Sequence, residues 1–295
     1  LMAAALLTDE PLVIHNVPEL RDVATLAGIL GALGVSSQRE GGTLTLWSED
    51  EQACEAPYDL VSTMRASVCV LAPLVARRGR ARVSMPGGCV FGVRPVDLHL
   101  KGLNALGAGI EVEGGYLVSD VRQRLQGASL YLASRFGSSV LATAQALMAA
   151  TLAEGTTVLE GAAMEPEITR LARCLQAMGA RIDGLGGHRL VIEGVERLHG
   201  AEVTVGGDRI EAGTFLVGAA MTAGDVTVDG VAPDELTALL EVLEGMGAEV
   251  ERGEQSVRCG ATRRLRAADV TTLPYPGFPT DLQAQMMAML CFAEG

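Results

Sequence analysis

The pattern of apolar and polar positions repeats along the chain at intervals of about 70 residues. In each repeat, a helix with one apolar face ends in a glycine, and two short strands joined by a glycine-containing turn follow. A glycine just after the last helical position is typical of a left-handed C-terminal cap. The glycines that predict these helix ends are Gly34, Gly107, Gly179 and Gly247. The sequence therefore predicts several copies of one structural unit.

Each repeat also contains a second predicted helix that is apolar on most sides, which indicates burial. These helices are predicted at 58–77, 138–153, 210–223 and 281–293. Those that continue run into a glycine and a further strand, at 81–85, 156–160 and 225–229. We expect an α/β fold in which three such units pack around the buried helices and form a domain of roughly 200 residues. This predicts a first domain at 1–203 and the opening of a second at 204–295.

The ends of the sequence interrupt this repeat. The chain starts with Leu1 rather than Met, and its first residues resemble the end of a buried helix. It stops after Glu294 and Gly295, where earlier repeats enter a strand. We therefore expect an internal fragment in which the second domain is incomplete.

Composition excludes several functional classes. Hydrophobic residues make up 48% of the chain, and charges or glycines interrupt its apolar stretches before the roughly 20 residues of a membrane span. The net charge of −13 argues against a general nucleic-acid-binding surface, although local arginines can bind small anions. The six cysteines lack the spacing of metal ligands, so no metal site is predicted. We expect a cytoplasmic protein with no membrane or nucleic-acid partner.

A glycine-rich segment at 85–99 contains the strongest chemical signal. Cys89 lies among three glycines, and Arg94 follows it. Pro95, Val96 and Asp97 then favour the start of a helix, whose free N–H groups attract anions. An electropositive site lowers the pKa of a thiol toward neutrality. Cys89 is therefore a candidate proton donor or nucleophile beside an anion site.

Several other residues have both a functional and a structural interpretation. Arg65 lies in an apolar helix, where it is either an anion ligand or half of a buried salt bridge. His99 is either part of the site or a polar residue in the first turn of a helix. Asp281 is functional, an N-terminal cap, or both. Asp208 and Arg209 either pair with each other or brace the link between the domains.

The glycine-rich loop and the repeats together resemble the UDP-N-acetylglucosamine 1-carboxyvinyltransferases, the enolpyruvyl transferases of the first committed step of peptidoglycan synthesis. The resemblance covers nearly the whole chain, with sequence blocks at 56–67, 86–99, 150–157, 165–168, 208–215 and 278–285. It implies an inside-out α/β barrel fold of two domains, each built from three repeats, with the substrates in the cleft between them. It also implies a transferase of cell-wall biogenesis.

The resemblance assigns expected roles to single residues. Cys89 matches the cysteine that protonates, or forms an adduct with, phosphoenolpyruvate and is alkylated by fosfomycin. Asp281 matches the carboxylate proposed to deprotonate the sugar 3-hydroxyl. The matches to substrate-binding residues are Arg65, Arg94, Pro95, Val96, Asp97, Leu98, His99, Ser139 and Val140. The expected partners are phosphoenolpyruvate and UDP-N-acetylglucosamine, and no cofactor is implied.

One block departs from the family pattern. The family carries Ser-Val-Gly-Ala-Thr at the start of a buried helix, where the backbone holds the nucleotide diphosphate. Here the run is Ser139-Val140-Leu141-Ala142-Thr143, and Leu141 adds bulk where a backbone must approach phosphate. Three functions therefore stay open: transfer to UDP-N-acetylglucosamine, transfer to another nucleotide acceptor, and non-catalytic binding of a nucleotide sugar. Because the family's Lys-Asn pair would precede this chain and its late arginines would follow it, we expect the chain alone to be inactive.

Overall fold

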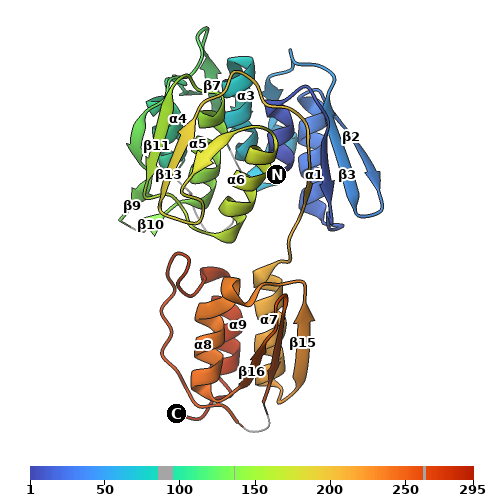
Figure 1. Ribbon diagram of the computed structural model, residues 1–295, viewed down its shortest axis with the longest axis vertical. Helices are drawn as coiled ribbons and strands as arrows, with labels where there is room; N and C mark the ends of the chain where they lie inside the picture. The colour runs from blue at the N-terminus through green and yellow to red at the C-terminus, as the bar shows by residue number, and fades with distance from the viewer. Residues whose placement is uncertain (86–95, 136, 262–263) are drawn as a thin grey trace. The chain divides into compact units, whose positions relative to one another are not determined.

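The computed structural model describes residues 1–85, 96–135, 137–261 and 264–295 (Figure 1). They form two compact units, Leu1–Val205 and Gly206–Gly295. Cys89, Arg94 and Pro95 lie outside the described residues, and only the backbone of Arg65 is described. No helix in the described part of the chain is long and apolar enough to cross a membrane.

Within the described residues of the first unit, three four-stranded sheets share one strand order. In each sheet an inner strand pairs antiparallel with the second strand of a hairpin and parallel with an outer strand. From the outer strand inward the orders are β14 (Ala201–Thr204), β1 (Leu12–His15), β3 (Thr43–Ser48) and β2 (Val35–Glu40); β4 (Glu55–Ala56), β5 (Arg80–Ser84), β7 (Tyr116–Asp120) and β6 (Glu111–Glu113); and β8 (Ser129–Tyr131), β11 (Thr156–Glu160), β13 (Arg189–Glu193) and β12 (Arg181–Asp183). A short ribbon of β9 (Ala133–Ser134) and β10 (Gly137–Ser138) is added to these.

Two classes of helix accompany the sheets. Amphipathic helices connect each inner strand to its hairpin: α1 (Arg21–Ala32), α4 (Asp97–Ala105) and α6 (Pro166–Ala177). The other class lies in the core: η1 (Met2–Leu7), η2 (Arg65–Val70), α3 (Leu71–Arg78) and α5 (Val140–Thr151). All residues of η1 are buried, and α5 is buried from Ala142 to Thr151.

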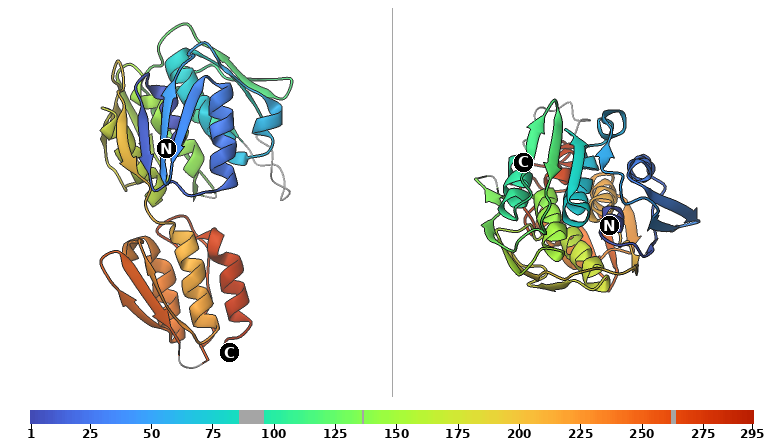
Figure 2. Two further views of the ribbon diagram at one scale, coloured as in Figure 1. Left: turned by 90° about the vertical axis from the view of Figure 1, so that its right-hand side faces the viewer. Right: turned by 90° about the horizontal axis from the view of Figure 1, so that it is seen from above.

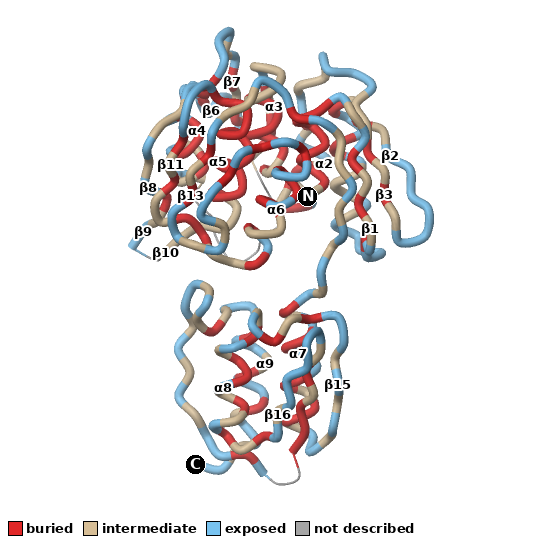
Figure 3. Tube along the Cα trace, viewed as in Figure 1, coloured by how far each residue is buried: buried red, intermediate tan, exposed pale blue. Residues whose placement is uncertain are grey.

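The buried helices pack against one another between the sheets. α3 contacts both η1 and α5, and the buried stretches of the chain run through α3 and α5 (Figure 3). In the right-hand view of Figure 2, the strands of the first unit lie around its helices. Because η1, α3 and α5 have no polar face, only this central position removes their side chains from water. The predicted inside-out α/β class is confirmed.

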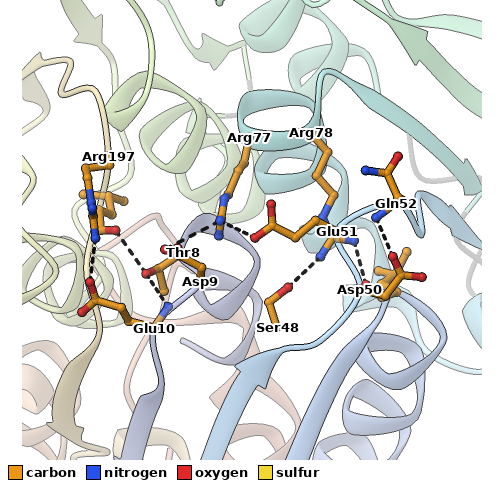
Figure 4. Close-up of polar contacts among 12 residues, drawn as sticks. Thr8, Asp9, Glu10, Ser48, Asp50, Glu51, Gln52, Arg77, Arg78 and Arg197 are labelled. Carbon is orange, nitrogen blue, oxygen red and sulfur yellow. Dashed lines mark hydrogen bonds and ion pairs between the residues drawn. The ribbon is translucent and has the colours of Figure 1, made fainter.

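The first sheet is closed by a strand from the far end of the unit. β14 pairs with β1 so that Ala201 lies opposite Leu12. Ahead of the two strands, the carboxylate of Glu10 accepts a hydrogen bond from the backbone N–H of Gly200, with 3.0 Å between the oxygen and the nitrogen. Glu10 also pairs with Arg197, with 2.8 Å between Oε1 and Nη2 (Figure 4). These contacts tie the end of the first unit to its beginning.

The second unit contains one more copy of the repeat. Its sheet has the order β15 (Asp225–Asp229), β17 (Ser256–Gly260) and β16 (Glu249–Arg252), which is the order of the other sheets without their outer parallel strand among the described residues. The helices are α7 (Arg209–Met221), η3 (Pro233–Leu236), α8 (Thr237–Met246), η4 (Thr280–Leu282) and α9 (Gln283–Leu290). A separate hydrophobic core packs between this sheet and α7, α8 and α9.

The local signals give the element ends well, with one correction. Gly34, Gly107, Gly179 and Gly247 have φ values of 75°, 88°, 100° and 102°, the left-handed conformation predicted for the helix ends. The single helix predicted at 58–77 is wrong, because α2 (Tyr58–Val61), η2 and α3 replace it. The Ser67 hydroxyl donates to the carbonyl oxygens of Val61 and Met64, which lets the chain turn instead of continuing one helix.

Candidate substrate site

The start of α5 contributes the first part of the candidate site. Ser139 is the N-terminal cap of this helix: its backbone is extended, and its Oγ accepts a hydrogen bond from the N–H of Ala142, 3.4 Å away. The N–H groups of Val140 and Leu141 belong to the first turn, where no intrahelical acceptor exists. Both residues are partly exposed. The helix therefore presents polar backbone groups that suit an anionic ligand.

The start of α4 contributes the second part. Val96 is the cap residue, and the helix is secured by a hydrogen bond from the N–H of Leu100 to the carbonyl oxygen of Val96, at 2.9 Å. The side chain of Asp97 is exposed, Leu98 is partly buried, and His99 is buried. An acidic residue in the first turn is stabilised by the helix dipole.

Close packing of α4 on α5 brings these two segments together. Gly102 makes the approach possible, because a Cβ atom there would lie 3.2 Å from the side chain of Leu132 and 3.5 Å from that of Ala146. One turn earlier on α4, the Nδ1 atom of His99 lies 2.8 Å from Nε2 of Gln145 on α5. Val96 to His99 and Ser139 to Val140 are therefore joined through one buried polar contact.

Burial controls the protonation of His99. The ring is only 8% exposed, and desolvation lowers its pKa below the usual histidine value, while the nearby Asp97 carboxylate opposes this effect. The imidazole is therefore neutral near pH 7. A neutral imidazole has one donor and one acceptor nitrogen, so it can discriminate between ligand atoms.

Two polar residues of α5 were missed by the sequence analysis. Gln145 and Thr143 are both fully buried. The Thr143 hydroxyl accepts a hydrogen bond from the N–H of Ala163, at 3.0 Å, and so holds the segment that leads into α6. The available signal was a pair of polar residues within an otherwise alanine-rich and leucine-rich helix.

The remaining predicted residues are placed only in part. The backbone of Arg65 starts η2, an element that contacts α5. Asp281 belongs to η4 of the second unit, and its side chain is exposed. Asp208 caps α7: its Oδ1 accepts from the N–H groups of Ile210 and Glu211, at 2.8 and 3.1 Å. The guanidinium of Arg209 is buried and lies over the ring of Tyr275.

No His, Cys, Asp and Glu cluster suited to a metal ion occurs among the residues that the structure describes. The polar groups brought together at the starts of α4 and α5 are backbone N–H groups, one hydroxyl, one imidazole and one carboxylate. Such a set can bind an anionic or polar organic ligand through hydrogen bonds.

Comparisons with known proteins agree with this arrangement. The chain is 50% identical over 295 residues to the UDP-N-acetylglucosamine 1-carboxyvinyltransferase of Methylacidiphilum infernorum, covering 100% of the chain and 70% of that protein. It is 48% identical over 298 residues to the protein of the same name from Psychrobacter arcticus, again covering 100% of the chain and 70% of the relative. The resemblance stated from the sequence motifs is thereby confirmed.

Solved structures show the same fold. The enolpyruvyl transferase NikO from Streptomyces tendae matches with a TM-score of 0.86 and 27% identity, over 100% of this chain and 70% of that one. An EPSP synthase from Acinetobacter baumannii matches with a TM-score of 0.67 and 20% identity, over 98% of this chain and 67% of that one, and shows the fold alone. The sequence also matches the family described as EPSP synthase (3-phosphoshikimate 1-carboxyvinyltransferase) over residues 1–295. The chain therefore belongs to the EPSP synthase family of carboxyvinyltransferases.

Proposed function

We propose that this protein transfers the enolpyruvyl group of phosphoenolpyruvate to the 3-hydroxyl of UDP-N-acetylglucosamine and releases phosphate. The observation that carries the proposal is the 50% identity, over all 295 residues, to a protein named for this reaction. The contact between His99 and Gln145 supports it, because it joins the two segments proposed to hold the nucleotide sugar.

The reaction needs an acid, a base and cations. Protonation of C3 of phosphoenolpyruvate accompanies attack of the sugar oxygen at C2; loss of a proton from C3 then expels phosphate and restores the double bond. We assign the acid to Cys89, either as proton donor or as the nucleophile of an adduct, and the base that takes the hydroxyl proton to Asp281. Arg65 and Arg94 are assigned to the anionic groups of the substrates, because guanidinium groups bind phosphate and carboxylate in a bidentate manner.

The acceptor is assigned to the starts of α4 and α5. Pro95, Val96, Asp97, Leu98 and His99 form one side of this proposed subsite. On the other side, Ser139 and Val140 offer the helix N-terminus to the diphosphate.

Leu141 motivates a second candidate function, transfer to a different nucleotide acceptor, because family members carry glycine at this position. The leucine side chain is partly buried and packs against the hydrophobic core of the first unit. That orientation leaves the helix N–H groups accessible, and it favours the diphosphate of UDP-N-acetylglucosamine over the alternative.

Phosphate release tests the proposal. The protein expressed from its full-length gene should release phosphate from phosphoenolpyruvate only when UDP-N-acetylglucosamine is present. Cys89→Ala should lower turnover by about two orders of magnitude or more, as expected for loss of a general acid. Cys291→Ala, which removes an exposed thiol of the second unit, should leave turnover unchanged.

The opposite results separate the alternatives. If folded wild-type protein releases no phosphate with this acceptor but does so with another nucleotide, the acceptor assignment is wrong. Binding of UDP-N-acetylglucosamine without turnover would identify a non-catalytic binding protein instead.

A further inference from the structure

Gln145 occupies an unusual position for a glutamine. Its side chain is completely buried in α5, between Ala144 and Ala146, at the contact with α4. Its Nε2 lies 2.8 Å from Nδ1 of His99, and its Oε1 is buried with no hydrogen-bond partner among the described residues. Each side-chain amide offers donors and an acceptor, so half of this group is left unsatisfied.

Stability alone does not account for this residue. A buried acceptor without a partner destabilises the folded state, and an apolar side chain of the same length would avoid that loss. Methionine has nearly the same shape and packs well among alanine and leucine side chains. The glutamine therefore has its advantage in the contact that it makes with His99.

The contact selects one form of the His99 ring. The amide nitrogen of Gln145 can only donate, so Nδ1 of the neutral imidazole must accept, and the ring proton is then on Nε2. Nε2 makes no hydrogen bond to any described residue and is not among the fully buried atoms without a partner. The ring thus presents one accessible N–H donor from an otherwise buried side chain.

The position of Gln145 suits an indirect role. It follows Ser139 by six residues on α5, which corresponds to about 9 Å along the helix axis. It lies in the interior behind the candidate subsite, so His99 separates it from any ligand bound there. A residue in this position acts on a ligand only through the histidine.

We propose that Gln145 is a positioning residue that holds His99 as the Nε2–H tautomer, so that this N–H donates a hydrogen bond to an acceptor oxygen of the nucleotide sugar. The inference rests on the proposed function and specifies one interaction of its acceptor subsite. It predicts that Gln145 contributes to recognition of the acceptor and not to folding.

Gln145→Met in the full-length protein separates these two contributions. We expect the urea midpoint of unfolding to stay unchanged or to rise, since an unsatisfied buried group is removed. KM for UDP-N-acetylglucosamine should rise about tenfold, while KM for phosphoenolpyruvate and kcat change less than about threefold. Gln176→Met is the matched control, because that amide donates to the carbonyl oxygen of Ile182 on another helix and does not contact His99.

The tautomer is measured independently of activity. Long-range proton–nitrogen correlation spectra of the wild type at pH 7 should show the Nε2–H form of His99, and Gln145→Met should show a mixture of both forms. A wild-type spectrum with the proton on Nδ1 would overturn the inference. So would a Gln145→Met variant that unfolds at lower urea concentration with KM for the nucleotide sugar unchanged, because that result identifies a structural role.

These readouts distinguish failure of the inference from failure of the proposed function. If the wild type has no transferase activity, the proposed function fails by that result alone. Titration of UDP-N-acetylglucosamine into the wild type then decides the inference: a shift of the His99 Nε2–H signal supports the hydrogen bond, and an unchanged signal at saturation overturns it.

Discussion

The hydroxyl of Thr8 donates a hydrogen bond to the carbonyl oxygen of Leu198, with 3.1 Å between the two oxygens, in the buried interior of the first unit. Thr8 precedes β1 and Leu198 precedes β14, so this bond joins the beginning and the end of the unit. Near it, the ion pair between Glu10 and Arg197 makes the same connection at the surface (Figure 4).

Thr8→Val should therefore destabilise the first unit more than loss of the exposed ion pair does. The valine leaves the buried Leu198 carbonyl without a partner, which costs about 1–3 kcal/mol. Arg197→Ala should cost at most about 1 kcal/mol, since its side chain is largely exposed and its charge is screened. Urea unfolding of the two variants gives both values, and a larger loss for Arg197→Ala would contradict this ranking.

The cap of α7 gives a second prediction. Asp208→Ala removes the acceptor for the N–H groups of Ile210 and Glu211 and should cost about 1 kcal/mol of helix stability. Amide hydrogen exchange at these two positions should become faster. Asp208→Asn keeps an acceptor oxygen in place and serves as the matched control, with exchange close to that of the wild type. Equal exchange in all three proteins would show that the side chain does not cap the helix in solution.

The buried cysteines should be unreactive in the folded protein. Desolvation by burial raises the pKa of Cys69 to about 11 and that of Cys259 to about 11. Near pH 8 only about one molecule in a thousand then carries the reactive thiolate. Iodoacetamide at that pH should label the exposed Cys291 and leave these two thiols unmodified until urea unfolds the protein. Peptide mass spectrometry detects the labels, and rapid labelling of Cys69 in the native state would contradict its burial.

An ion pair between β15 and β17 makes the second unit sensitive to acid. A hydrogen bond from Arg258, followed in effect by its charge, lowers the pKa of the Asp225 carboxyl below its usual value. The pair therefore stabilises the folded state above the unfolded-state pKa of about 3.9, and this contribution disappears as the pH falls through the lower folded-state pKa.

Asp225→Asn tests this pH dependence. The urea midpoint of the wild type should exceed that of the variant near pH 6, and the difference should shrink as the pH falls below about 4. A difference that is independent of pH would show that the carboxylate charge does not contribute.

The sequence predicts those parts of the fold whose causes are local. Gly179 and Gly247 end their helices because the left-handed conformation there strains any side chain, and this signal needs no knowledge of the rest of the chain. The strands at 156–160 and 225–229 follow from alternating apolar residues and are found at those residues.

Non-local contacts could not be predicted in the same way. The parallel pairing of β14 with β1 sets Ala201 opposite Leu12, and no local pattern specifies a partner so distant along the chain. For the candidate site, the sequence predicted His99 from its motif but not Gln145, which lies 46 residues away and becomes a neighbour only when α4 packs on α5. Roles for Cys89 and Asp281 stay predictions.

The most direct test of the central claim is the identity of the reaction product. Full-length protein is incubated with carbon-13-labelled phosphoenolpyruvate and UDP-N-acetylglucosamine, and the nucleotide fraction is analysed by mass spectrometry and carbon-13 NMR. The account predicts a labelled enolpyruvyl ether on the 3-oxygen of the sugar, formed in step with phosphate. Unlabelled nucleotide sugar recovered after incubation with folded protein would contradict it.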